Sequence, residues 1–98
     1  MFVGALLVQL HLPTSDSLKD KRQVVKSLIA RLSAQFGVSV AEVGQLDARQ
    51  SAELGVAKVS NEAHHVEGVL EALVRFIEET RPDVEVMSVA REIERPFD

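Results

Sequence analysis

The 98-residue chain contains no cysteine, tryptophan or tyrosine, and its only aromatic side chains belong to four phenylalanines. The absence of cysteine excludes disulfide frameworks, thiolate nucleophiles and cysteine-based zinc sites. It also fits a reducing compartment, so we expect a cytoplasmic protein. With so few aromatic side chains, a nucleic-acid surface on this protein would have little on which bases can stack.

Long apolar runs are missing as well. The longest, Phe2 to Leu12, is interrupted by Gln9 and His11 and is too short to cross a bilayer. It also lacks the positively charged flank and the small-residue cleavage site of a secretory signal, so we interpret it as a strand of the folded protein. We therefore expect no membrane contact.

Positive charge is in the minority. The chain has 11 Lys and Arg residues against 15 Asp and Glu, for a net charge of -4. This balance disfavours nonspecific binding of nucleic acid over the whole surface, so any such contact has to be local. The hydrophobic share of 46% and charged share of 27% are typical of a globular chain, and the length predicts a single domain over residues 1–98.

Catalytic signatures are absent too. The sequence has no phosphate-binding glycine loop, no G-x-S-x-G elbow and no HExxH motif. His64 and His65 are adjacent, so on a helix they would project about 100° apart, unlike the i, i+4 histidine pair of a helical metal site. We expect no enzymatic activity, cofactor or metal. A small-molecule or catalytic pocket around the two histidines is the alternative.

The sequence does contain four segments with the pattern of strands. Phe2 to Leu12 and Ala52 to Ser60 are apolar in both alternation phases, as central strands are. Val38 to Leu46 precedes the second of these, and the two are predicted to form a hairpin. Val84 to Ile93 is the last predicted strand.

Two amphipathic helices separate these strands. A 3.6-residue apolar period from Leu18 to Phe36 predicts the first helix, with Ser17 and Asp20 at capping-box spacing and Gly37 as a left-handed C′ residue.

The second helix has an apolar stripe from Val66 to Ile77. Ser60 or Asn61 is its expected cap, and Arg81-Pro82-Asp83 should end it. The order β-α-β-β-α-β predicts an α+β, ferredoxin-like fold, with both helices on one face of a four-stranded antiparallel sheet and the first and third strands in the middle.

In this fold one face of the sheet has no helix over it, yet the middle strands are apolar on both sides. Exposed apolar area of this kind marks an interface, and a homodimer is its simplest form. The alternative is that small side chains expose little area there and polar neighbours solvate the rest. The candidate interface residues are Val3, Ala5, Leu7, Ala57 and Val59, with Met87 and Val89 as further members from the last strand.

A basic cluster opens the first helix in this otherwise acidic chain. Lys19, Lys21, Arg22 and Lys26 could contact phosphate groups, which makes RNA a candidate partner. Cations at a helix N-terminus oppose the macrodipole, however. The alternative is that these long side chains lie along the edge of the core and pair with Asp20 or with glutamates elsewhere.

Four segments occur in order along the chain: Ser17-Leu18-Lys19-Asp20-Lys21-Arg22, Val24 to Leu28, Phe36 to Val43 and Leu54 to Ser60. Together they resemble the YlxP-like family, small bacterial proteins classed as a domain of unknown function. The resemblance covers the chain from the first strand to the second helix and implies a ferredoxin-like fold without known catalytic residues. Relatives are often encoded among genes for transcription elongation, translation initiation and ribosome maturation, which implies RNA or a ribosomal particle as partner.

Relatives commonly have an Asp-x-Trp-Gln pattern before the third strand, where this chain has Asp47-Ala48-Arg49-Gln50. Arg49 stands in place of the aromatic residue and is added to the candidate RNA contacts, because a guanidinium can stack on a base or bind phosphate. The sequence thus favours a non-enzymatic binding module that is RNA- or ribosome-associated, and a homodimerising interaction module is the main alternative.

Overall fold

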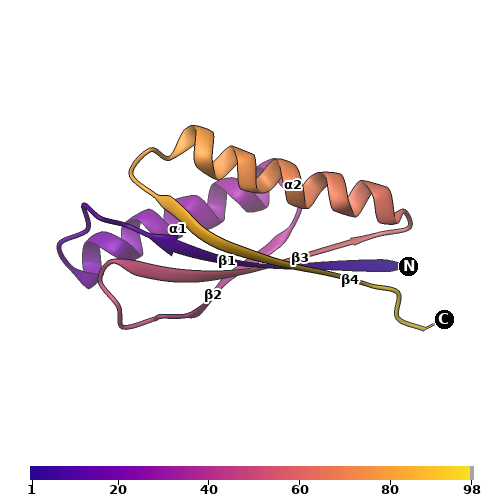
Figure 1. The fold of residues 1–98 in the computed structure, drawn as a ribbon, viewed down its shortest axis with the longest axis horizontal. Coiled ribbons are helices and arrows are strands. Elements are labelled where there is room, and N and C mark those ends of the chain that lie inside the picture. Colours follow the sequence, from indigo (N-terminus) through magenta and orange to yellow (C-terminus); the bar gives the residue numbers. More distant parts are fainter. Residues whose placement is uncertain (98) are drawn as a thin grey trace.

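In the computed structural model, which describes residues 1–97, two helices pack on one face of a four-stranded sheet (Figure 1). The strands lie in the order β2-β3-β1-β4, and every neighbouring pair is antiparallel. The ferredoxin-like prediction is confirmed, with β1 and β3 in the middle. The elements are β1 (Phe2–His11), α1 (Leu18–Phe36), β2 (Ser39–Gly44), β3 (Ser51–Ser60), α2 (Ala63–Thr80) and β4 (Glu85–Glu94).

The core lies between the helices and one side of the two middle strands. Leu6, Val8 and Leu10 of β1 are buried, as are Leu54 and Val56 of β3. Because successive strand residues point to opposite faces, these residues share the helix side of the sheet. The predicted helical stripes are confirmed and provide the other half of the core. Its fully buried helix residues are Leu28 and Leu32 of α1 and Val66, Leu70, Leu73 and Ile77 of α2.

Local signals set the ends of α1 as predicted. The Ser17 hydroxyl accepts a hydrogen bond from the Asp20 backbone N–H at 3.1 Å. The Asp20 carboxylate accepts one from the backbone N–H of Asp16 at 3.2 Å, one residue before its place in a standard capping box. Gly37 has a φ of 60° and ends the helix. Lys58 of β3 donates to the Gly37 carbonyl at 3.0 Å, which places a cation at the negative end of the helix dipole.

The start of α2 differs from the expectation. Glu62 is the N-cap residue and makes no side-chain cap hydrogen bond, so the prediction that Ser60 or Asn61 caps this helix is wrong. Ser60 is still paired with Phe2 at the end of the β1–β3 ladder, and its hydroxyl accepts from the Glu62 N–H at 3.2 Å before the helix begins.

The end of α2 is as predicted, at Thr80, before Pro82. Arg81 then donates two hydrogen bonds to Asp83, at 2.9 and 2.7 Å. This pairing lowers the pKa of Asp83 and raises the pKa of Arg81. A carboxyl group whose pKa is lowered on folding stabilises the protein at pH values above its unfolded-state pKa. This stabilisation is lost as the pH falls through the folded-state pKa of Asp83.

A bulge in the β1–β4 pairing corrects one expectation for the last strand. The register shifts between Gln9 and Leu10. Met87, at the bulge, lies beside Gln9 on the uncovered face, whereas Val89 is paired with Val8 and so lies on the helix side. The prediction that both residues reach the uncovered face is therefore wrong for Val89.

The contact between β1 and α2 is closest at Gly4. A Cβ at this position would overlap Cγ1 of Val66 and lie 3.0 Å from Cδ1 of Leu70. We expect Gly4→Ala to lower the free energy of unfolding by about 1–3 kcal/mol, measured by urea denaturation, because α2 would have to move away from the sheet.

Gly68 provides the control for this substitution. A Cβ at Gly68 would meet nothing within 4 Å, so Gly68→Ala should raise the free energy of unfolding by up to about 1 kcal/mol through its better helix propensity. Equal stability of Gly4→Ala and the unmodified protein would contradict the close approach of α2.

Candidate functional site

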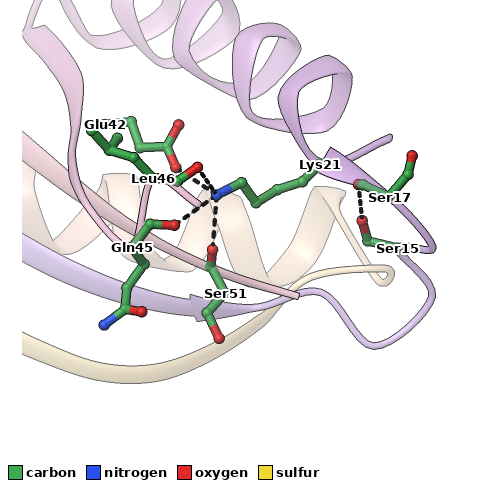
Figure 2. A network of polar contacts seen from close by, with 7 residues as sticks. All are labelled: Ser15, Ser17, Lys21, Glu42, Gln45, Leu46 and Ser51. Carbon is green, nitrogen blue, oxygen red and sulfur yellow. Dashed lines mark hydrogen bonds and ion pairs between the residues drawn. The ribbon is translucent and has the colours of Figure 1, made fainter. Parts of the chain in front are cut away.

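Lys21 enters the protein interior from the first turn of α1, and its side chain is fully buried. It belongs to the inward stripe of the helix, four residues before Val25. Figure 2 shows its ammonium group pointing into the loop between β2 and β3. Nζ lies near four oxygens: the carbonyls of Gln45 at 2.8 Å, Leu46 at 3.2 Å and Ser51 at 3.2 Å, and the carboxylate of Glu42 at 3.0 Å.

This arrangement gives Lys21 a structural role. A buried ammonium is costly unless polar groups replace its water, and here a carboxylate and three carbonyls do so. Gln45 and Leu46 begin the β2–β3 loop and Ser51 is the first residue of β3, so the ammonium holds the two ends of that loop together. Lys21 is therefore not available to phosphate, and its place among the predicted RNA contacts is corrected. The alternative, pairing with a distant glutamate, holds for this residue through Glu42.

The β2–β3 loop is joined to the start of α1 by its last residues. The Gln50 side chain donates to the carbonyls of Pro13 at 3.3 Å and Ser15 at 3.2 Å. The exposed Arg49 has its Nη1 3.5 Å from the carbonyl oxygen of Asp16. The structure thus brings Arg49 next to the N-terminal end of α1.

The other three predicted basic residues form an exposed row on α1. Within residues 1–97 no hydrogen bond or ion pair is recorded for the side chains of Lys19, Arg22 or Lys26. At about 100° per residue, Arg31 projects opposite to Arg22, and its guanidinium lies 5.2 Å from the ring centre of Phe76 in α2. The basic row, defined as Lys19, Arg22 and Lys26, therefore faces away from α2.

The face of the sheet without helices, here called the open face, is the second candidate surface. All five predicted interface residues lie on it, because they alternate with the buried residues of β1 and β3: Val3, Ala5, Leu7, Ala57 and Val59. Leu7 is 38% exposed and Val59 is 58% exposed. Val43 of β2, at 52%, also belongs to this face. Sequence reasoning missed Val43 because the phase of β2 was not known.

Leu7 and Gly55 occupy the centre of the open face. They are cross-strand partners near the midpoints of the two middle strands. From β2 to β4, the cross-strand partners at this position are Ala41, Gly55, Leu7 and Ala90. Beside Leu7, small side chains and the Val43 side chain, which lies against Gly55, line a concavity of about 600 Å³. A leucine side chain therefore stands directly beside a hollow.

Charge on the open face is negative and lies mainly along β4. Glu85, Glu92 and Glu94 point to this side, as do their cross-strand partners in β1. Glu53 of β3 accepts a hydrogen bond from Gln9. No lysine or arginine of the four strands points to the open face, so its apolar centre has one acidic rim.

The concavity has few groups suited to catalysis. Its polar side chains are Ser39 and Glu92. His64 and His65 are exposed in the first turn of α2 and do not line it. In the part of the chain that the structure describes, no cluster of three or more histidine or acidic side chains is placed to hold a metal ion, and neither helix combines the length and hydropathy needed to cross a membrane.

Comparison of the sequence with known proteins identifies its family. The profile of the family described as "Protein of unknown function (DUF503)" matches residues 3–91. The "Uncharacterized protein YlxP" of Bacillus subtilis (strain 168) is 36% identical over 71 residues, which cover 72% of this chain and 76% of that protein.

Solved structures share the fold. The de novo designed protein LFR1 1 with ferredoxin fold is 14% identical with a TM-score of 0.53, over 100% of this chain and 88% of the design. The designed protein Foldit4 is 13% identical with a TM-score of 0.59, over 97% and 100%. The VAO-type flavoprotein MtVAO615 from Myceliophthora thermophila C1 is 15% identical with a TM-score of 0.58, over 95% of this chain but 16% of the flavoprotein. At these identities the likeness concerns the fold alone.

Replacing Lys21 tests its structural role. We expect Lys21→Met to lower the free energy of unfolding by about 3–5 kcal/mol, because it leaves the Glu42 carboxylate and three loop carbonyls without their donor. Lys26→Met, on the exposed row of the same helix, should change stability by less than about 0.5 kcal/mol. Chemical denaturation of both variants measures the difference, and similar small losses would show that the ammonium does not hold the loop.

Proposed function

Since the chain belongs to the DUF503 family of proteins of unknown function, we propose its role from its surfaces: it is a non-enzymatic binding module that docks a macromolecular partner on the open face. The observation that carries this proposal is the exposed apolar centre of a sheet face that no helix covers.

The apolar side chains on the open face support docking because their exposure has an energetic cost. Leu7, Val43 and Val59 are each more than a third exposed and lie on neighbouring strands. Removing apolar surface from water contributes about 25 cal/mol per Å². Monomeric proteins rarely leave large contiguous apolar patches uncovered. A partner that covers these side chains therefore gains a substantial driving force.

The shape of the concavity favours a macromolecule over a small molecule. Small-molecule sites usually enclose most of the ligand and direct several polar groups toward it. Here the hollow lies on the surface of the sheet and is lined mainly by alanine and valine residues and the backbone of Gly55, with Leu7 beside them. An apolar protein surface is the complementary occupant.

Site-specific photo-cross-linking in cells tests the docking proposal. We expect a photoreactive amino acid at Val59, on the open face, to form covalent adducts with a protein. The same group at Val89, which is 44% exposed but lies on the helix side, is the control and should form few. Equal yields at both positions, or no adduct at Val59, would contradict docking on the open face.

The basic row supports a second candidate function, contact with RNA or a ribosomal particle. Lys19, Arg22 and Lys26 are exposed, and their side chains make no hydrogen bond or ion pair with the residues that the structure describes. The chain as a whole has a net charge of -4, and Arg49 is held near the start of the same helix. Exposed cations of this kind bind phosphate, with arginine offering two parallel donors.

Charge reversal tests this second function. We expect Arg22→Glu to weaken binding to structured RNA or ribosomal particles and to reduce the slope of log affinity against log salt by about 1, the contribution of one phosphate contact. Arg75→Glu, an exposed reversal on α2, is the matched control and should leave binding unchanged. Binding that is absent at every salt concentration, or equally weakened by both variants, would contradict the role of the basic row.

A further inference from the structure

We infer that the partner of the open face is a second copy of this chain, joined in a symmetric dimer whose two-fold axis runs parallel to the strands, between β1 and β3. This inference rests on the docking function proposed above and names its partner. Three properties of the open face carry it: the leucine beside a hollow at its centre, the acidic rim on one edge, and the available area.

The central pair is self-complementary under this symmetry. Rotation about an axis between β1 and β3 places β1 opposite β3 of the partner subunit. Because the axis is parallel to the strands, each residue keeps its position along the strand direction. Leu7 then faces Gly55 of the partner subunit, and Gly55 faces the partner's Leu7, because the two residues are cross-strand neighbours. This reciprocal contact is the property of an isologous interface. Each leucine then enters the opposite hollow and packs against Val43 of the partner subunit, whose side chain lies against Gly55.

Packed sheets cross at about 30°, so this match holds best near the centre of the interface. Leu7 and Gly55 lie at that centre, on the middle strands and near their midpoints.

An axis perpendicular to the strands would give a poorer fit. It would place Leu7 against the partner's Leu7 and leave the hollow beside Val43 in each subunit without a leucine to enter it. Protein interfaces match the packing density of protein interiors, so such voids forfeit contact energy. This axis would also place β4 on β4, which brings the acidic rims together. Like charges facing each other across an interface are unfavourable.

The outer strands fit the axis parallel to the strands as well. There β4 lies opposite β2 of the partner subunit, whose residues on the open face are uncharged: Ser39, Ala41 and Val43. Ala90 faces Ala41, and the Glu92 carboxylate faces the Ser39 hydroxyl, which can donate a hydrogen bond to it. The acidic rim of each subunit thus avoids its counterpart.

The area of the open face is close to the minimum for a specific dimer. Three ten-residue strands and one six-residue strand cover roughly 570 Å², at ~3.3 Å per residue and ~4.8 Å between strands. Because the six-residue β2 covers only part of the ten-residue β4 opposite it, two copies would bury roughly 1,000 Å² of projected area. This is about the minimum for a specific interface and below the ~1,200 Å² of a standard one.

Light scattering over a range of concentrations tests the partner. The purified protein should be a dimer, and Leu7→Lys should raise the dimer Kd about a hundredfold or more, because it would bury an unpaired ammonium at the centre of the interface. Val89→Lys introduces the same charge at a similarly exposed valine on the helix side and should leave the Kd within a few fold. A monomer at millimolar concentration, or equal effects of the two variants, would overturn the inference.

Cross-linking tests the direction of the axis, and the cysteine-free chain allows single cysteines to be placed. Facing sheets lie about 10 Å apart, within reach of a short bismaleimide. Subunits carrying Ala41→Cys mixed with subunits carrying Ala90→Cys should cross-link, whereas Ala90→Cys alone should not. Strong cross-linking of Ala90→Cys alone would instead indicate β4 on β4 and overturn the proposed axis.

The photo-cross-linking experiment separates the two levels of this account. Adducts of Val59 with a second copy support both the docking function and the dimer. Adducts with a different protein, together with a monomer in solution, support docking and overturn the dimer. The absence of any adduct overturns both.

Discussion

A sheet whose middle strands are apolar on both sides needs cover on both sides, and the helices of this chain cover only one. On the helix side, Leu6, Val8 and Leu54 are buried against α1 and α2. On the other side, Leu7 and Val59 remain in contact with solvent. The core and the candidate interface are therefore two consequences of one alternation pattern, because each of the two strands supplies residues to both faces.

The two candidate surfaces are separate in space and compatible with each other. Lys21 turns inward and holds the β2–β3 loop, while Lys19 and Arg22 stay on the solvent side of α1. The helices and the open face lie on opposite sides of the sheet (Figure 1). A dimer formed through the open face would therefore leave both basic rows accessible, one on each outer layer. In that arrangement, self-association and phosphate contact would not compete.

Local patterns in the sequence predicted the elements and their order, because helix caps, apolar periods and turn residues act over short distances. The role of Lys21 depends on carbonyls 24 to 30 residues away, and no local pattern reports where these converge. The orientation of β1 was ambiguous because both of its phases are apolar. Val89 was misplaced because the bulge opposite Gln9 and Leu10 changes the phase of β4, which its own alternation does not reveal.

The most direct test is the accessibility of the Leu7 methyl groups in the purified protein, measured by NMR as their broadening by a soluble paramagnetic probe. Val89 serves as the internal reference, since it is 44% exposed against 38% for Leu7 in a single subunit. If a second copy covers the open face, Leu7 will be broadened much less than Val89, and the difference will grow as the protein concentration rises. Similar broadening of both residues at every concentration would show that the open face stays uncovered and would contradict the proposed dimer.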